Sequence, residues 1–434
     1  MPIDTPDVLR STIVLVVNLL DLLYIPLGLV TAPLWLRKRR EGWDERFGHV
    51  DAMFDPEGID TDLPCVMLHS VSVGEVNALR ALVPMLSGEA HVFVSSTTDT
   101  GLARARSLFG TLDHVSVVRY PLDCSWMVKR FLNTVQPDVV GLVELEVWPN
   151  FIKICHKREI PIGIINGRIS ARSYKGYRKL RVLLRPTFSR LSFACVQDGQ
   201  YAERIEAMGV PKERVSITGS MKWDSISTEP RSEPSERAKT IAREMGVDLS
   251  RPIVVAGSTG PNEEGLMHEA VPDNVQLIIA PRKTERFDEA ARAVPGCVRR
   301  SSGEQGMGAS RFLLDTIGEL SAVYELADLV IMGRSFNDQY GSDPIEPAAS
   351  GKPVLIGERH SDFQVAIELL TQSGGLRVVE RDHLGRVVQE LLGDADLRAQ
   401  MGRAAQGCVR AQQGATGRHM DVLLRAVIRP DEGA

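Results

Sequence analysis

The chain has 434 residues, of which 43% are hydrophobic and 25% are charged, as in ordinary globular proteins of two or three domains. The 51 basic and 56 acidic residues give a formal net charge of −5, so bulk charge does not favour nucleic acid as a partner. The six cysteines form no CxxC pair and the nine histidines lack ligand spacing, which disfavours a disulfide framework and a metal site.

The N-terminal segment predicts attachment to a membrane. Residues 11–36 form an apolar run long enough to cross a bilayer, although Asn18 and Asp21 interrupt it, and residues 37–40 are all basic. A basic cluster after the apolar run disfavours a cleaved signal peptide and should lie on the cytoplasmic side. A spanning helix, a helix lying in the interface and a helix docked on the protein itself are three interpretations of this segment.

Strand and helix patterns then alternate in two series. Continuous β-branched runs such as residues 64–72, 90–98 and 138–146 are typical of a parallel sheet covered on both faces. A segment rich in Pro, Ser and charge at 227–239 separates this series from a second one. We therefore predict an α/β protein with three regions: the anchor with its basic juxtamembrane segment at 1–47, and Rossmann-like domains at 48–225 and 226–434. Its ligand should bind in a central cleft between the two domains.

Acidic residues follow two strands of the first series. Glu75 comes after the strand 64–72, where it is either a first-turn helix acid or the base of an enzyme. Glu144 and Glu146 end the strand 138–146 and either bind substrate hydroxyls or only cap the next element of the chain. These positions belong to the carboxyl edge of a parallel sheet, where α/β proteins bind ligands.

A basic segment at 166–190 holds eight positive side chains and no acid. Such a run is usually a solvated face. Here apolar residues such as Leu180 and Leu183 interleave with it, and this pattern favours an anionic membrane surface or a phosphorylated lipid.

The second series carries candidate anion-binding positions. Arg282 ends a strand and suits a phosphate or carboxylate. The segment DTIGEL, 315–320, either offers backbone N–H groups to a ligand or only caps a helix. Asp343 should begin a helix that Gly351 ends, in which Glu346 either accepts hydrogen bonds from ribose hydroxyls or is a first-turn acid.

Taken in order, these motifs resemble the 3-deoxy-D-manno-octulosonic acid (Kdo) transferases of lipopolysaccharide synthesis. The resemblance covers nearly the whole chain and rests on HSVSVGE, SSTTDTG, YPLD, VELEVWPN, NGRISARS, PRKTERF, DTIGEL and DPIEPAASGKPVL. It implies a GT-B fold and an inverting glycosyltransferase on the cytoplasmic face of the inner membrane. CMP-Kdo would be the donor and a lipid A precursor (lipid IVA) the acceptor, with no metal and no cofactor.

The resemblance also implies residue roles. Glu75 matches the candidate general base, in an acceptor-binding domain at 48–225. The acceptor residues in that domain would be Glu144, Glu146, Arg168, Arg172, Lys175 and Arg178. The donor residues, in the domain at 226–434, would be Ser258, Arg282, Gly318, Glu319, Ser335 and Glu346.

Departures from the family pattern gather on the donor side. Lys283 replaces the His of PRH, Arg334 replaces the second Gly of GGS, and Gly260 replaces the His after GST. Where the family has Gly-Gly-His-Asn before PLEPA, this chain has Tyr340, Gly341, Ser342 and Asp343. Asp362 replaces an Asn on the donor side, and Ser220 replaces an Asn on the acceptor side. The alternatives are therefore a rewired donor site, a transferase for another activated sugar on a lipid acceptor, or an inactive membrane-bound scaffold.

Overall fold

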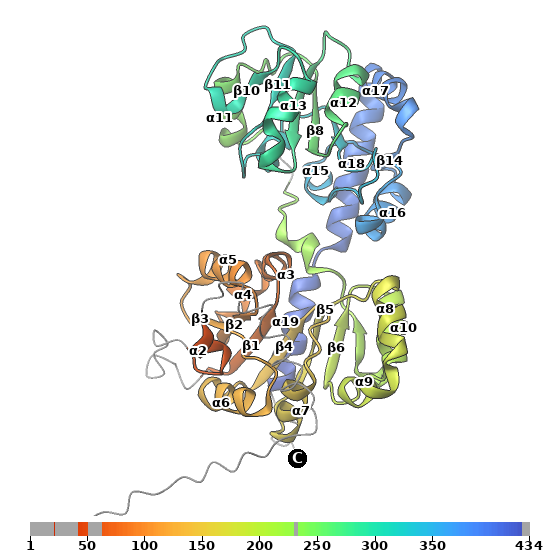
Figure 1. Cartoon of the computed structure of the whole chain (residues 1–434). Helices are drawn as coiled ribbons and strands as arrows, with labels where there is room; N and C mark the ends of the chain where they lie inside the picture. Colours follow the sequence, from red (N-terminus) through yellow and green to blue (C-terminus); the bar gives the residue numbers. More distant parts are fainter. Residues whose placement is uncertain (1–20, 22–41, 51–62, 230–232, 428–434) are drawn as a thin grey trace, which may run out of the picture. The chain divides into compact units, whose positions relative to one another are not determined.

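The computed structural model describes residues 21, 42–50, 63–229 and 233–427, apart from the side chain of Arg172. The chain divides into two compact units (Figure 1). The first comprises Met1–Ser225 and Gly414–Ala434, and the second comprises Ile226–Gln413. Each unit is built on its own parallel sheet.

The sheet of the first unit has the strand order β3-β2-β1-β4-β5-β6-β7. Its strands are β1 (Cys65–Ser70), β2 (His91–Ser96), β3 (Val115–Arg119), β4 (Val139–Val143), β5 (Ile162–Gly167), β6 (Phe193–Val196) and β7 (Val215–Ile217). Every residue of β1, β2, β4, β5 and β6 is buried. Continuous burial explains why these strands are uninterrupted apolar runs without polar alternation.

Helices cover both faces of this sheet. One face packs on α6 (Ser125–Val135), α7 (Pro149–Lys157), α9 (Arg181–Phe188) and α10 (Gly199–Met208). The other packs on α3 (Val73–Ala78), α4 (Leu82–Leu86), α5 (Asp99–Phe109) and α19 (Ala415–Val427). The short elements α2 (Trp43–Arg46), α8 (Ala171–Lys179), η2 (Lys212–Arg214) and η3 (Met221–Ser225) complete the unit.

The last helix corrects the predicted domain limits. The sequence placed all of 226–434 in the second domain, but α19 lies in the first unit, along its sheet (Figure 1). Leu423 is fully buried among core residues of β1 and β4, and the ring of His419 accepts a hydrogen bond from the Asn166 N–H at 2.8 Å. The chain therefore returns to the first unit after Gln413 because the apolar face of α19 completes that core.

The second unit repeats the architecture with the strand order β10-β11-β9-β8-β12-β13-β14. Its strands are β8 (Ile253–Thr259), β9 (Gln276–Pro281), β10 (Val298–Arg299), β11 (Arg311–Leu313), β12 (Leu329–Met332), β13 (Val354–Ile356) and β14 (Leu376–Val378). Its α-helices are α11 (Glu236–Met245), α12 (Glu264–Ala270), α13 (Phe287–Ala293), α14 (Leu320–Tyr324), α15 (Ile345–Ala349), α16 (Gln364–Gln372), α17 (Leu384–Gly393) and α18 (Ala395–Gln412). Single turns of 3-10 helix are η4 (Thr284–Arg286), η5 (Arg300–Ser302), η6 (Ser361–Phe363) and η7 (Arg381–His383).

Each sheet has a central point from which the chain builds outward in both directions, although in the second sheet the chain also turns back from β10 to β11 at the edge. In the first unit this switch point lies between β1 and β4, and in the second it lies between β8 and β12. Open α/β sheets bind ligands outside the carboxyl ends of the strands at such points. The fold therefore marks one candidate ligand-binding edge on each unit.

Most of the predicted anchor lies outside the described residues. Asp21 is described and is buried against the first unit, where its carboxylate accepts hydrogen bonds from Ser125 N–H at 2.9 Å and Asn150 Nδ2 at 3.1 Å. Both partners lie in the first turns of their helices, α6 and α7. In the part of the chain that the structure covers, no helix is long and apolar enough to cross a membrane.

Candidate functional site

Glu75 follows β1 at the first switch point. It lies in the first turn of α3, where its carboxylate also accepts hydrogen bonds at the start of the helix. Ser72 is the N-cap residue, and its hydroxyl donates to Glu75 Oε1 at 2.7 Å, while Val71 N–H donates to Oε2 at 2.7 Å. This arrangement is close to a capping box, in which an acid three residues after the N-cap satisfies free N–H groups. Glu75 is nevertheless 9% exposed, and burial raises the pKa of its carboxyl despite these hydrogen bonds.

Two further carboxylates, Glu144 and Glu146, interact electrostatically with Glu75. Glu144 and Glu146 follow β4, the neighbour of β1 in the sheet. The charge of Glu144 contributes to the raised pKa of Glu75. Burial, followed by the charge of Glu75, raises the pKa of Glu146 to about 7, although the Trp148 indole donates to it at 3.2 Å. Glu75 and Glu146 have raised pKa values, so this cluster contains carboxylates that can serve as proton acceptors.

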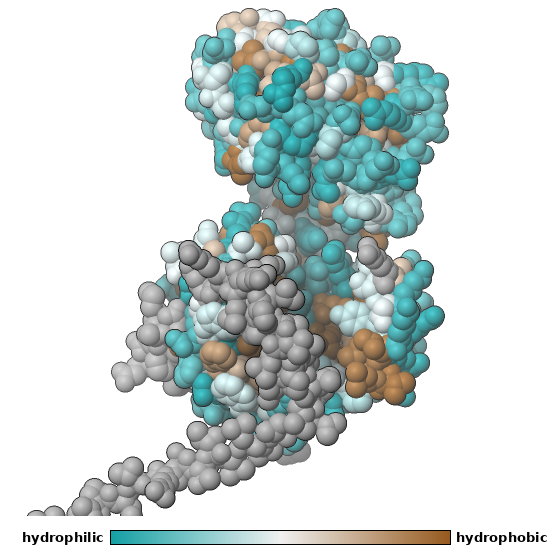
Figure 2. Space-filling view, in the orientation of Figure 1, coloured by the Kyte–Doolittle hydropathy of each residue, from teal (hydrophilic) through white to brown (hydrophobic). Residues whose placement is uncertain are grey.

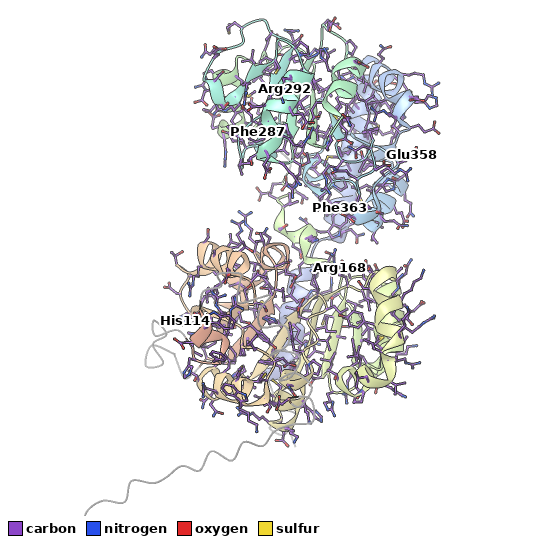
Figure 3. The ribbon with its side chains drawn as sticks, viewed as in Figure 1. His114, Arg168, Phe287, Arg292, Glu358 and Phe363 are labelled. Atoms are coloured by element: carbon purple, nitrogen blue, oxygen red, sulfur yellow. The ribbon has the colours of Figure 1, made fainter. Side chains whose placement is uncertain are left out.

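Arg168, which follows β5, pairs with one of these acids. Its Nε donates to Glu144 Oε2 at 2.9 Å, and its side chain is exposed at the carboxyl edge (Figure 3). Lys175 and Arg178 are exposed on α8 and, among the described residues, form no ion pair. The side chain of Arg172 lies outside the description.

Helices α8 and α9 present a mixed basic and apolar surface, which we call the α8–α9 surface. It consists of Lys175, Arg178, Lys179, Leu180, Arg181, Val182, Leu183 and Arg185. Val182 is 91% exposed and Leu183 is 63% exposed, and apolar side chains gather over α9 in Figure 2. Exposed apolar side chains flanked by cations are typical of a surface that contacts anionic lipid.

On the second unit, three predicted donor residues, Ser258, Arg282 and Glu346, act together with Asp343 on a buried tyrosine. Tyr324 ends α14, and burial is the main cause that raises the pKa of its phenol. The charges of Glu346 and Asp343 raise this pKa further, while Arg282 and the hydroxyl of Ser258 lower it. Arg282 and Glu346 are exposed at this carboxyl edge. The second switch point therefore combines a cation with two acids, as a site for a charged, hydroxyl-bearing ligand requires.

The DTIGEL segment leads into α14, whose N-cap residue is Glu319, but the Glu319 side chain makes no capping hydrogen bond. The Glu319 carboxylate accepts a hydrogen bond from the Thr316 hydroxyl and pairs with Arg300 at 3.2 Å. These contacts hold the pKa of Glu319 below its usual value. Gly318 is exposed with φ 86°, the left-handed conformation that favours glycine.

Ser335 does not meet the prediction of a direct ligand contact. Its side chain is 1% exposed, and its hydroxyl donates to Met332 O at 2.6 Å while accepting from Gly357 N–H at 2.8 Å. Both hydrogen-bonding directions are used inside the unit, so the hydroxyl links the ends of β12 and β13. The GGS pattern could not reveal that burial.

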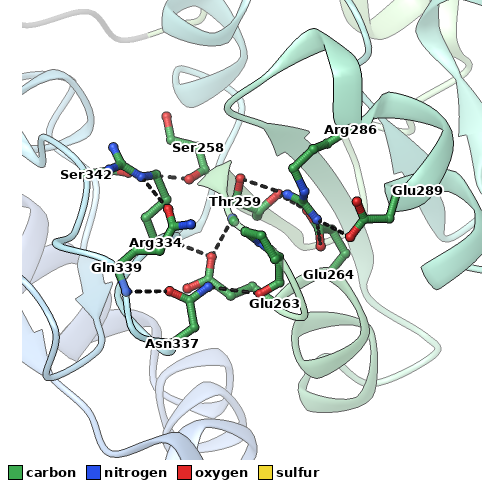
Figure 4. A network of polar contacts seen from close by, with 12 residues as sticks. Ser258, Thr259, Glu263, Glu264, Arg286, Glu289, Arg334, Asn337, Gln339 and Ser342 are labelled. Carbon is green, nitrogen blue, oxygen red and sulfur yellow. Dashed lines mark hydrogen bonds and ion pairs between the residues drawn. The ribbon is translucent and has the colours of Figure 1, made fainter.

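Two of the residues that depart from the family pattern, Gly260 and Arg334, donate backbone hydrogen bonds to the buried Glu263 (Figure 4). Its carboxylate accepts four backbone N–H groups from the loops after β8 and β12, at 2.5–2.9 Å; the donors are Gly260, Arg334, Ser335 and Phe336. The Ser342 hydroxyl donates to Ser258 O at 3.4 Å, and Asp343 accepts Ile345 N–H at 3.1 Å at the start of α15.

Two other departures are on the surface. Lys283 and Asp362 are exposed, and Asp362 N–H donates to Tyr340 O at 3.1 Å. That bond joins the loops after β12 and β13, which line a cavity of about 360 Å³ with side chains that include Tyr340, Arg359 and His360. Apart from Ser220, which belongs to the first unit, the departures are therefore spread over several loops of the second unit.

Strained backbone marks both edges. Glu144, Ser258 and Arg334 have φ of 59°, 56° and 60°, in the left-handed region that non-glycine residues rarely adopt. Each such residue costs on the order of 1–3 kcal/mol and persists where the surrounding structure holds it, as at functional sites. Sequence reasoning did not find this feature, nor the roles of Glu263 and Tyr324. The paired acids after the GST motif were the one available signal for Glu263.

The acids of the two edges are not arranged as a metal site. Within residues 42–50, 63–229 and 233–427, no group of three or more His, Cys, Asp or Glu side chains is placed to hold a metal ion. The absence of a metal from the proposed chemistry stays a prediction.

Comparison with known families agrees with this geometry. Residues 41–225 match the family described as 3-deoxy-D-manno-octulosonic-acid transferase. The chain is 31% identical over 431 residues to the 3-deoxy-D-manno-octulosonic acid transferase of Haemophilus influenzae, covering 95% of this chain and 97% of the relative. It is 29% identical over 415 residues to the Bordetella pertussis enzyme of the same name, covering 90% and 94%.

Solved structures with low sequence identity share the fold. Anabaena HepE in complex with UDP superposes with a TM-score of 0.59 at 14% identity, covering 84% of this chain and 100% of that one. UDP-GlcNAc 2-epimerase from Neisseria meningitidis, bound to UDP-GlcNAc, gives 0.56 at 13% identity over 83% and 100%. The predicted fold class, two Rossmann-like domains of the GT-B type, is confirmed.

Proposed function

This chain belongs to the family of Kdo transferases, and on that premise we propose that it moves Kdo from CMP-Kdo to a lipid A precursor, lipid IVA, in lipopolysaccharide synthesis. The observation that carries the mechanism is the buried Glu75 with Glu144 and Glu146 at the first switch point. A glycosyl transfer needs a proton acceptor for the attacking hydroxyl, and this cluster supplies one.

In the proposed step, the acceptor hydroxyl oxygen forms a bond to the anomeric carbon of Kdo while the bond from that carbon to the CMP phosphate oxygen breaks. The electron pair leaves with CMP, and the hydroxyl proton passes to Glu75. Attack from the face opposite CMP inverts the anomeric configuration. A positioned general base contributes roughly 10²–10⁴-fold in rate. Since the base must be unprotonated, the raised pKa of Glu75 predicts that activity rises with pH above 4.5, the ordinary value.

We assign the donor to the second unit. Arg282 would neutralise the CMP phosphate as the bond to Kdo breaks, and Glu346 would accept hydrogen bonds from the ribose. Support comes from the electrostatic proximity of both residues to Tyr324. Positive side chains rather than a metal ion would balance the developing charge.

The acceptor is an amphiphile, so we assign the enzyme to the cytoplasmic face of the inner membrane. The α8–α9 surface would contact anionic headgroups, while Arg168, Lys175 and Arg178 would meet the phosphates of the lipid A precursor. Support comes from the exposure of these cations and of Val182. The apolar segment at 11–36 would add a hydrophobic contribution to attachment.

A transferase for another activated sugar is the second candidate. The observation that favours it is Asp343, whose negative charge lies near Glu346 and Arg282 in the proposed donor site. An added acid beside a phosphate is unfavourable unless a cation offsets it.

The test incubates detergent-solubilised full-length protein with CMP-Kdo and a tetraacylated lipid A precursor, with Glu75→Ala run beside it. CMP release and glycolipid mass are both followed. Transfer by the wild type alone supports donor and base. Transfer by both would remove Glu75 as the required base. No transfer by either would reject the CMP-Kdo assignment, and UDP-linked sugars would then be tried on the same acceptor.

A further inference from the structure

Arg334 is one of the positions at which this chain departs from the family pattern at the second switch point. It follows β12, whose neighbour in the sheet is β8, and β8 ends at Ser258 and Thr259. The family pattern has glycine here, and φ of 60° is the conformation that glycine adopts without strain. A residue as large as arginine in this conformation needs a reason.

The surrounding residues hold Arg334 at both its backbone and its side chain. Its N–H donates to Glu263 Oε2 at 2.5 Å, and Glu263 is fully buried. Its Nε donates to Gln339 Oε1 at 2.8 Å, while Gly341 N–H donates to its carbonyl at 2.8 Å. The strained conformation is therefore fixed, and the orientation of the guanidinium is restricted (Figure 4).

Gly260 provides the space that the Arg334 side chain occupies. A Cβ atom at Gly260 would lie 3.2 Å from Arg334 Cγ and 3.0 Å from Asn337 Nδ2, which is tighter than ordinary contact. The family pattern has histidine at 260 and glycine at 334, the reverse arrangement. Compared with the family pattern, this chain lacks a histidine ring at position 260 and carries an arginine at position 334, and the two positions adjoin each other in space.

The charge of Arg334 is available at this edge. In the described part of the chain its guanidinium forms no ion pair, and its side chain is partly exposed. The nearby Glu263 carboxylate is directed inward, where four backbone N–H groups already bind it. A partly exposed guanidinium that is held through Nε and forms no ion pair among the described residues is suited to bind a phosphate or carboxylate.

We propose that Arg334 binds an oxyanion of the nucleotide-sugar donor, and that Gly260 and Glu263 position it for this role. The inference rests on the proposed function for the location of the donor on the second unit. The oxyanion is either the CMP phosphate or the sugar carboxylate. Arg334 thereby provides positive charge that offsets the acid at Asp343.

The test compares Arg334→Gly with wild-type full-length protein. The measurements are the Kd for CMP by calorimetry, the KM for CMP-Kdo and the thermal unfolding midpoint. A lost charged hydrogen bond predicts a donor affinity about 10- to 100-fold weaker. Because glycine relieves the strained φ, the unfolding midpoint should stay equal or rise, which a merely structural arginine would not give. Asn262→Gly is the matched control, since Asn262 has φ of 62° in the same region and carries no charge.

The outcomes separate the two oxyanions. A weaker Kd for CMP identifies the phosphate, because CMP carries no sugar carboxylate. An unchanged Kd with a raised KM for CMP-Kdo identifies the carboxylate. If both stay within about twofold of wild type, a factor too small for a charged hydrogen bond, the proposal is wrong. The proposal is also wrong if the loss of donor affinity in Arg334→Gly is accompanied by a lower unfolding midpoint, because a damaged fold would then explain the loss.

The paired positions provide a second arm. Gly260→His should weaken CMP binding less in the Arg334→Gly background than in wild type, since the clash with Arg334 Cγ is gone. An equal loss in both backgrounds would contradict the pairing. If wild type does not bind CMP, the proposed donor fails, and UDP is titrated into the same variants. If the protein binds UDP with an affinity that depends on Arg334, the proposal of an oxyanion site at Arg334 stands. If it binds neither CMP nor UDP, the proposal is wrong.

Discussion

The two sheets use the same edge for opposite kinds of chemistry. At the first switch point, between β1 and β4, three carboxylates crowd together and burial raises the pKa of two of them, Glu75 and Glu146. At the second, between β8 and β12, the charges of the exposed Arg282 and of Asp343 and Glu346 all act on Tyr324, and the partly exposed Arg334 follows β12. A carboxylate whose pKa is raised is a stronger base and suits proton removal, whereas fixed guanidinium groups suit an anionic leaving group.

The comparison shows that the Rossmann topology specifies where a ligand binds and the loop residues specify what is done to it. Both edges carry residues in the left-handed conformation, Glu144 on the first and Ser258 with Arg334 on the second. Substitutions at one edge should therefore change one function and leave the other intact.

The largest expected effect is on the first edge. Glu75→Gln removes the proton acceptor and should lower kcat by roughly 10²–10⁴-fold with no change in the Kd for CMP. The control is Ser72→Ala, which removes the N-cap and should cost about 0.5–2 kcal/mol of stability while the base remains. Turnover by Glu75→Gln above a tenth of wild type would mean that Glu75 serves α3 and not the chemistry.

The next effect is on the second edge. Arg282→Ala should raise the Kd for CMP by about 10- to 100-fold, because a charged hydrogen bond to the phosphate is lost. Binding of the lipid acceptor should not change. Calorimetry measures the Kd for CMP, and binding to vesicles that contain the lipid acceptor measures the acceptor affinity. Equal losses of donor and acceptor affinity would contradict a division of roles between the edges.

A smaller effect is expected on the α8–α9 surface. Lys175→Ser with Arg178→Ser should weaken binding to anionic vesicles by about 1 kcal/mol for each charge removed, and more salt should reduce the difference. The matched control is Arg243→Ser with Arg292→Ser, two exposed cations of the second unit (Arg292 is labelled in Figure 3). If both pairs weaken binding equally, only net charge matters.

The smallest effect concerns stability. The pKa of Glu146 is raised from 4.5 to about 7 in the folded chain, so the folded state retains a proton that the unfolded chain releases between these values. Stability from this group is present below pH 4.5 and is lost as pH rises through 7. Glu146→Gln should therefore stabilise the first unit at pH 8 relative to pH 5, on the order of 1–2 kcal/mol. Unfolding midpoints of Glu146→Gln and wild type at both pH values measure this change in stability. The control is Glu213→Gln on the surface, and the same pH-dependent change in that variant would contradict the prediction.

Much of the fold could be predicted because the strands are buried on both faces. Runs such as Cys65–Ser70 and Val139–Val143 have no polar alternation, and that pattern alone indicates a parallel sheet. The return of α19 to the first unit could not be predicted. The pattern of an amphipathic helix indicates that one face is apolar, but it does not indicate which sheet that face will cover.

The candidate site could be predicted in part. Strand ends identified Glu75, Glu144 and Arg282 because the carboxyl edge follows from topology. The roles attached to them came from the resemblance to a family. The burial of Ser335 and the four N–H groups bound by Glu263 depend on how two loops distant in sequence meet, which no local pattern encodes.

If proton removal and donor binding belong to different edges, a single variant of the first edge should separate them. Calorimetric titration of CMP into full-length Glu75→Gln gives the Kd, and Kdo transfer to the lipid A precursor is followed by mass in the same preparation. We predict a Kd equal to that of wild type and a transfer rate lower by at least about 10²-fold. A Kd that weakens in step with the loss of transfer would contradict this division, because Glu75 would then belong to donor binding.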